Sequence, residues 1–200
     1  YNANAALLSN TTGNYNSAFG EGALASNTTA SNNTAVGYQS SYTNSTGTNL
    51  TAIGYQAGYS NTVSGGTFIG ASTGYSNSTG LYNLFVGAAA GYSNTTGSYN
   101  SFLGGADFSG YPAGYTNSTG SYNTALGNGA LKSNTTANQN TAVGYQSLYT
   151  NNTGTLNAAV GAYASYLNTT GSSNVSFGQG ALYSNSTGSY NTSIGQASLQ

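Results

Sequence analysis

The chain has 200 residues, of which only Glu21, Asp107 and Lys132 are charged, and it contains no His, Cys, Met or Trp. Acid–base, thiol and metal chemistry therefore lack their usual groups, and we expect no enzyme activity, no cofactor and no metal site. A net charge of −1 gives no cationic surface for nucleic acids or anionic membranes, and no apolar run approaches the roughly 20 residues that span a bilayer. Neither partner is expected.

An apolar residue followed by Gly recurs along the chain, mostly in steps of 17 residues. One step has 16 residues, near Ser64–Gly66, and one has 23, around Gly105–Gly114. We predict one repeat array over residues 1–200, a section of a longer fibre, with an inserted loop at 105–114. A unit of this length, rich in Gly, Asn, Thr and Tyr, predicts an all-β fold, namely a parallel β-solenoid of about eleven 17-residue coils.

Each coil contains three segments, of which the first two are predicted strands. The T-A-V/I-G segment is the first expected strand, and Y-Q-A/S-x-Y-S/T is the second. The N-x-T-G segment is an expected turn, because Asn and Thr bond locally to backbone and Gly adopts positive φ.

The position before the recurring Gly is apolar in every coil, and we predict that it forms the structural core. Its residues are Phe19, Val36, Ile53, Ile69, Val86, Leu103, Leu126, Val143, Val160, Phe177 and Ile194. The preceding position, from Ala18 to Ala159, holds Ala or Phe and should point the opposite way. We expect it at contacts between chains of a homo-oligomer, as a parallel trimer, unless its Ala residues are merely small enough to tolerate solvent.

An unbroken Asn column should form a ladder of amide hydrogen bonds along the fibre. It contains Asn10, Asn27, Asn44, Asn61, Asn77, Asn94, Asn117, Asn134, Asn151, Asn168 and Asn185. With the Thr column two residues later it also spells N-x-T, the acceptor sequence for N-glycosylation. Either the turn and ladder, or glycosylation of some coils, would explain this pattern.

Two further features are candidates for contacts. A Tyr column that includes Tyr42 and Tyr183 either packs along the fibre or offers ring faces to sugars. The inserted loop contains Asp107, Phe108, Tyr111 and Pro112, and it is either a binding loop or a neutral insertion.

The N-T-A-V-G units at Asn33–Gly37 and Asn140–Gly144 resemble the N-S-V-A-I-G motif of YadA-like heads in trimeric autotransporter adhesins. They are also similar to N-T-A-V-G-Y-Q-A-L arrays in tail fibres and surface proteins of phages and bacteria. The resemblance covers the whole chain. It implies a left-handed parallel β-roll of three chains that holds a binding tip away from a surface, or that itself binds matrix or host receptors.

The expected function is therefore that of an extracellular structural or adhesive fibre, on a cell surface or a virion. Its expected partners are further copies of the chain, and a host-surface glycan or protein receptor. Two alternatives stay open: a self-assembling, glycosylated surface filament, and an ice-binding solenoid that presents N-x-T arrays.

Overall fold

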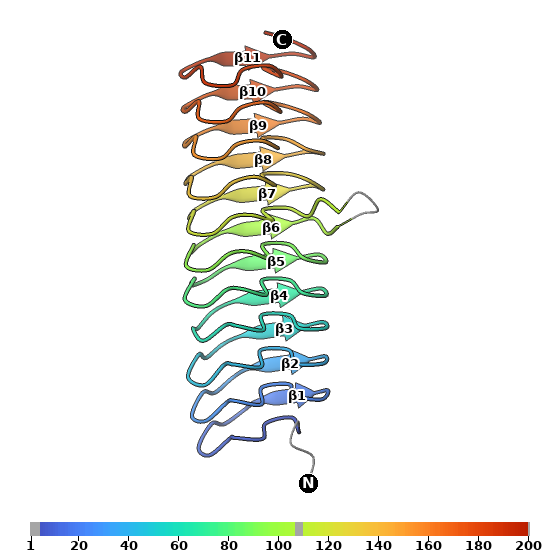
Figure 1. The fold of residues 1–200 in the computed structure, drawn as a ribbon, viewed down its shortest axis with the longest axis vertical. Helices are drawn as coiled ribbons and strands as arrows, with labels where there is room; N and C mark the ends of the chain where they lie inside the picture. Colours follow the sequence, from blue (N-terminus) through green and yellow to red (C-terminus); the bar gives the residue numbers. More distant parts are fainter. Residues whose placement is uncertain (1–4, 107–109, 200) are drawn as a thin grey trace.

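The computed structural model describes residues 5–106 and 110–199 and has the predicted solenoid fold. One three-residue strand from each coil joins a single parallel sheet, in which the strand order follows the sequence (Figure 1). The strands are β1 Ser17–Phe19, β2 Thr34–Val36, β3 Thr51–Ile53, β4 Thr67–Ile69, β5 Leu84–Val86, β6 Ser101–Leu103, β7 Thr124–Leu126, β8 Thr141–Val143, β9 Ala158–Val160, β10 Val175–Phe177 and β11 Thr192–Ile194. Within the described ranges, no helix has the length and apolar character needed to cross a membrane.

Neighbouring strands pair in register, so that equivalent residues of successive coils lie side by side. Thr34 pairs with Thr51, and Val36 pairs with Ile53. The 16-residue and 23-residue coils keep this register, since Thr51 pairs with Thr67 and Ser101 with Thr124. Each sequence column is therefore a row along the rod, with a repeat of about 4.8 Å.

The predicted second strand is wrong. The Y-Q-A/S-x-Y-S/T segment forms turns. Counted from the recurring Gly as position one, the third and fifth residues of the coil adopt left-handed φ. In one coil these residues are Gln146 (φ 52°) and Leu148 (φ 49°). An extended strand requires negative φ at each residue, so the segment bends inward twice and closes the coil.

The Gly that ends each strand is required by its environment. Gly37 has φ of 129°, and a Cβ at this residue would lie 2.4 Å from the carbonyl oxygen of Gly54 in the next coil. Any larger residue would push the coils apart, which explains why this Gly marks the repeat.

The core lies on the opposite strand face from the predicted one. The Ala/Phe position, Ala18 to Ala159, points into the coil, and all its residues from Ala35 onward are fully buried. The prediction that this column lies between chains is therefore wrong. The predicted core column, Phe19 to Ile194, points outward and is exposed or half-buried. The choice between adjacent apolar positions depends on the width of the coil, which sequence hydrophobicity does not reveal.

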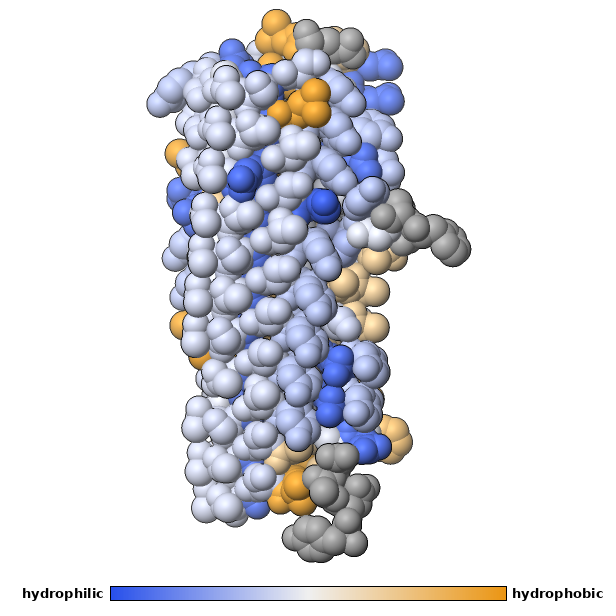
Figure 2. All heavy atoms as spheres, viewed as in Figure 1, coloured by the Kyte–Doolittle hydropathy of each residue, from blue (hydrophilic) through white to orange (hydrophobic). Residues whose placement is uncertain are grey.

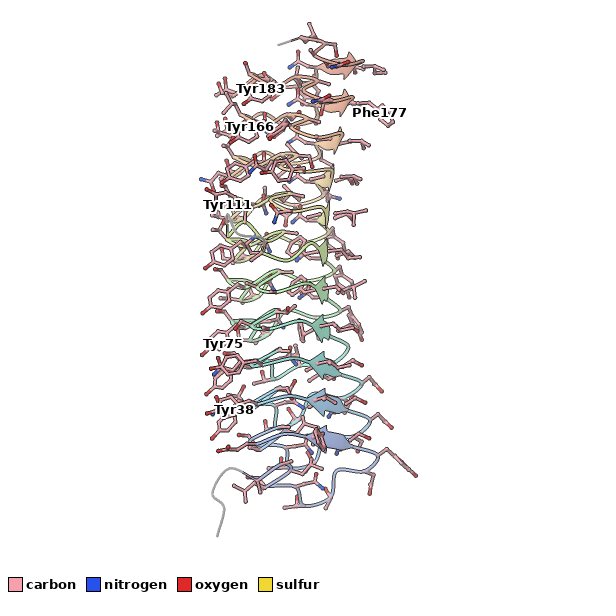
Figure 3. All side chains as sticks on the ribbon, turned by 90° about the vertical axis from the view of Figure 1, so that its right-hand side faces the viewer. Tyr38, Tyr75, Tyr111, Tyr166, Phe177 and Tyr183 are labelled. Atoms are coloured by element: carbon pink, nitrogen blue, oxygen red, sulfur yellow. The ribbon has the colours of Figure 1, made fainter. Side chains whose placement is uncertain are left out.

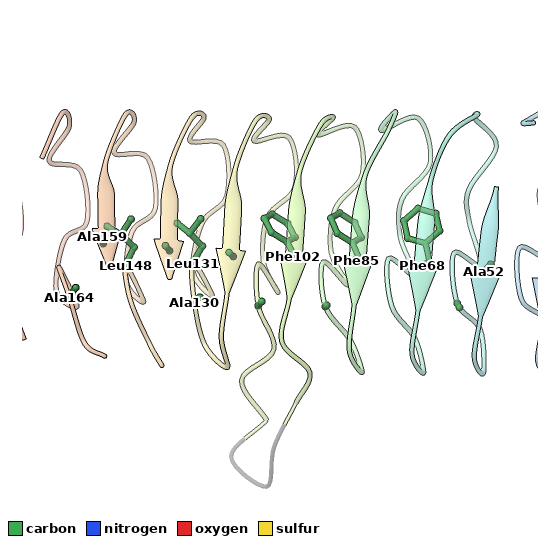
Figure 4. Close-up of a cluster of buried hydrophobic side chains, with 14 of the residues drawn as sticks. Ala52, Phe68, Phe85, Phe102, Ala130, Leu131, Leu148, Ala159 and Ala164 are labelled. Atoms are coloured by element: carbon green, nitrogen blue, oxygen red, sulfur yellow. The ribbon is translucent and has the colours of Figure 1, made fainter. Parts of the chain in front are cut away.

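Two positions of the coil contribute side chains to the interior, and their sizes are complementary. One is the Ala/Phe position of the strand, and the other is the fifth residue of the coil, in the facing turn. The strands contribute Phe68, Phe85 and Phe102 to three successive coils (Figure 4), and the turns that face these rings contain Gly. Where the strand contributes Ala, the turn often contributes Leu, and Leu131 and Leu148 are examples. Phe85 and Phe102 stack at 4.9 Å between ring centroids. In the described coils a large core residue therefore comes from the strand or from the turn, and never from both.

This balance predicts the behaviour of a double-mutant cycle. Phe85→Ala should destabilise the fold by about 3–5 kcal/mol, because it leaves a ring-sized cavity. Gly91→Leu should also destabilise it, since a Cβ at Gly91 would lie 2.6 Å from Cε2 of Phe85. In the double variant the new Leu occupies the cavity in the manner of Leu131, so the combined loss should be smaller than the sum. Chemical denaturation measures the free energies; additive losses would contradict the proposed complementarity.

Candidate functional site: the outward sheet face and the side-chain ladders

The outward face of the sheet combines an apolar column with a column that is mostly Thr or Ser. The apolar residues are those predicted as core, and Ile53, Leu126 and Phe177 are 39%, 46% and 57% exposed. Two residues earlier in each strand is a second outward residue, such as Thr51, Thr124 or Thr141. Figure 3 shows Phe177 extending away from the rod on the strand side, opposite the labelled tyrosines.

No charged residue lies in either outward column. The side of the rod seen in Figure 2 is mostly weakly polar and has only scattered strongly hydrophilic or hydrophobic residues. A continuous outward apolar row of this length commonly marks a contact surface. The outward sheet face is therefore the principal candidate site.

The predicted Asn ladder is confirmed in eight of its ten steps. In these steps Nδ2 of one Asn donates to Oδ1 of the Asn in the preceding coil, over 2.6–3.2 Å. The same Nδ2 also donates to a turn carbonyl, for example from Asn134 to Ala137 at 3.1 Å. The ladder is interrupted at Asn44, whose Oδ1 accepts from the backbone N of Gly47, and Oδ1 of Asn27 is left without a partner.

A second Asn column, which the sequence analysis missed, forms another buried ladder. In most coils Oδ1 of this Asn accepts from the backbone N of the equivalent residue in the next coil, as Asn123 does for Asn140 at 3.0 Å. Its Nδ2 donates to a turn carbonyl, as from Asn123 to Ala137 at 2.8 Å. The column contains Asn16, Asn33, Asn83, Asn100, Asn123, Asn140, Asn157, Asn174 and Asn191. The recurrence of Asn directly before most of the strand segments was the signal that could have revealed it.

Burial of the first ladder decides against glycosylation of its inner coils. Asn77, Asn94 and Asn117 are fully buried, and both amide hydrogens of each are donated within the rod. A glycan on Nδ2 would remove one hydrogen and require space that the coil does not have. The N-x-T pattern therefore serves the turn and the ladder in these coils.

The Thr of the same motif forms a single exposed row, from Thr12 to Thr187. The N-x-T array expected for ice binding is not formed in the inner coils, because the Asn points inward while only the Thr faces solvent.

The predicted Tyr column packs as a stack along the rod. Ring centroids of successive residues from Tyr42 to Tyr115 are 5.0–5.5 Å apart, and interplanar angles are 3–21°. A second segment runs from Tyr149 through Tyr166 to Tyr183. Both faces of an inner ring such as Tyr75 are covered by neighbouring rings, so these faces are closed to sugars.

Lys132 interrupts this stack, and the inserted segment supplies a ring beside it. The Tyr111 ring lies 5.5 Å from that of Tyr149 in an edge-to-face arrangement, and Nζ of Lys132 lies 5.6 Å and 5.3 Å from their respective centroids. Pro112 is buried against the rod. The predicted loop residues Asp107 and Phe108 lie outside the described residues.

The insertion leaves the coil between β6 and β7 (Figure 1) and returns without changing the hydrogen-bond pattern. The backbone N of Ala113 donates to Gly104 O, where a regular coil has Ala130 N donating to Gly127 O. Ala106 N donates to the coil below, and Tyr111 O accepts from the coil above. Each limb of the insertion therefore completes one half of a regular turn.

No family model, curated protein or solved structure matches the chain.

The buried ladder predicts a large cost for removing one amide. Asn134→Ala would leave Asn117 Oδ1 without its donor. It would also remove one of the two amides that donate to Ala137 O, and one of the two acceptors of Asn151 Nδ2. We expect a loss of about 2–5 kcal/mol in the free energy of unfolding. The matched change Thr136→Ala, at an exposed position of the same turn, should change stability little. Equal losses for the two variants in chemical denaturation would contradict the role of the ladder.

The Tyr149–Tyr111 contact predicts a pH dependence. Burial, followed by the hydrogen bond with Tyr111, raises the pKa of Tyr149 from 10.0 to about 12. The folded chain therefore holds this proton more tightly than the unfolded chain does, so the contribution to stability is present below pH 10 and is lost as the pH rises towards 12. Spectrophotometric titration of the wild type and Tyr149→Phe should differ by one late-ionising phenol. A difference that titrates near pH 10 would contradict this assignment.

Proposed function

We propose that the chain is a section of a non-enzymatic, extracellular structural or adhesive fibre whose rods associate through the outward sheet face. The observation that carries the proposal is the continuous, uncharged row of outward apolar side chains along eleven strands, of which seven are exposed and four are half-buried. Burial of apolar surface favours association, and in-register repetition adds a similar gain at every coil. Because the Ala/Phe column is buried inside the coil, the proposed contact between chains lies on this outward face instead.

The size of the face supports association. Ten steps of about 4.8 Å give a length of about 50 Å, and a three-residue strand is about 10 Å wide. The sheet face alone therefore covers about 500 Å², and its flanking turn residues bring it towards the roughly 800 Å² per partner that a stable interface buries. A parallel homotrimer is the proposed state, because each chain would present the same face to a common axis.

The proposed biological role follows from the rod rather than from a reactive group. A stiff array with few charges holds a binding region away from a cell or virion surface, and contacts with a host glycan or protein receptor belong to this role. A self-assembling surface filament is the alternative, and it would use the same face with a different number of chains.

The association is tested by changing the face while leaving the core intact. Ile53→Lys with Ile69→Glu introduces opposite charges on adjacent coils of the face, and such a pair adds no like-charge repulsion. We expect the variant to fold but to sediment as a monomer, whereas the wild type sediments as a trimer. The control Thr79→Lys with Thr96→Glu places the same charges on the exposed Thr row and should leave the trimer intact. A monomeric wild type at micromolar concentration, or a face variant that still assembles, would refute the proposal.

A further inference from the structure

Tyrosine is the side chain that an oxidant would attack first in this chain. The sequence contains 19 Tyr and no Cys, Met, Trp or His, which are the other readily oxidised residues. A one-electron oxidant therefore acts on phenols without competition from thiols, thioethers or indoles. The outcome depends on which phenols are accessible and on what lies beside them.

Five tyrosines share one coil position, two residues before the first outward residue of the strand. These are Tyr15, Tyr82, Tyr99, Tyr122 and Tyr190, which we call the edge tyrosines. Each adopts left-handed φ, between 54° and 61°, so the turn directs the side chain outward at the margin of the sheet face. All five are exposed, whereas the stacked column from Tyr42 to Tyr183 is half-buried.

Three of the edge tyrosines, Tyr82, Tyr99 and Tyr122, stack on one another, and the central ring is exposed at its rim rather than on its faces. Tyr99 stacks on Tyr82 at 5.5 Å and on Tyr122 at 5.1 Å between centroids. Although both of its faces are covered, Tyr99 remains 47% exposed, so the exposed part is the edge that carries the hydroxyl and the ortho carbons. Those are the atoms at which phenoxyl radicals couple.

We propose that the edge tyrosines are sites of oxidative cross-linking between rods. A peroxidase that consumes hydrogen peroxide would remove one electron and one proton from a phenol on each of two chains. The two radicals join through a bond between ortho (Cε) carbons, and the hydrogen on each coupled carbon moves to its oxygen. The balance is two tyrosines and one hydrogen peroxide giving one dityrosine and two water molecules.

The partner is a second copy of this chain. Stacked rings within one chain meet face to face and are held one strand spacing apart by the in-register sheet, whereas a bond between ortho carbons joins rings edge to edge. A ring from a neighbouring rod has no such restraint. The inference rests on the proposed association, because the outward sheet face places the margins of two rods beside each other.

The test treats the full chain with peroxidase and hydrogen peroxide, then measures covalent multimers on denaturing gels, dityrosine fluorescence and cross-linked peptides. We expect multimers whose cross-links map to the edge tyrosines. Replacing all five with Phe preserves the stacks and should reduce the multimer yield several-fold without changing the sedimentation of the untreated assembly. The control Tyr59→Phe, Tyr75→Phe and Tyr92→Phe, in the half-buried stack, should leave the yield unchanged.

The outcomes separate this inference from the proposed function. An assembled wild type that forms no covalent multimers, or whose cross-links map to Tyr38, Tyr55 or Tyr145, would overturn the inference alone. Equal loss of yield in the two Phe variants would also overturn it. A wild type that sediments as a monomer would instead refute the association on which the inference rests.

Discussion

In-register stacking of equivalent residues is the constraint on which the rest of the structure depends. Each side chain has its own column as its nearest neighbour, about 4.8 Å above and below. A residue type is therefore favoured when it interacts well with itself. An Asn amide donates to the amide in one neighbouring coil and accepts from the amide in the other, and Tyr rings stack on one another. Like charges in one column would instead repel along the rod. This accounts for the 2% charged residues and for the dominance of Asn, Thr, Gly and Tyr.

The narrow interior imposes a second constraint. A typical coil accommodates two buried Asn side chains, a short turn and at most one large apolar group from the strand or the facing turn. Ser165 and Ser176 show the same pairing with polar groups, because their hydroxyls bond to each other at 2.9 Å inside one coil. We therefore expect substitutions at these two positions to be coupled, whereas the outward positions, which face away from the core, vary in size from Val36 to Phe177.

The repeat predicted the parallel solenoid, the strand at T-A-V/I and the first Asn ladder, because each depends on period and residue type. It did not predict which strand face points inward, because Ala142 and Val143 are both apolar. The width of the coil decides which of the two is buried. The coincidence of Phe68, Phe85 and Phe102 with Gly in the facing turns was the available signal. Left-handed Gln146, Leu148 and Tyr122 were not predictable from propensity, because these residues ordinarily avoid positive φ.

Buried amides and outward apolar side chains both depart from the usual radial distribution of polarity in proteins, and this departure links the fold to its proposed role. Asn amides share the interior with the apolar core, and their directional hydrogen bonds fix the vertical register of most coils. Val, Ile and Phe occupy the outer sheet face. Burial of these side chains would lower the free energy without requiring a particular direction of contact, but in a single rod they stay in contact with solvent. The two sets of residues are separate: the ladders lie inside each rod, and the outer face is where we propose that rods meet. The association we propose therefore requires no change in the coil, and each additional coil would lengthen the rod and enlarge the contact face in equal proportion.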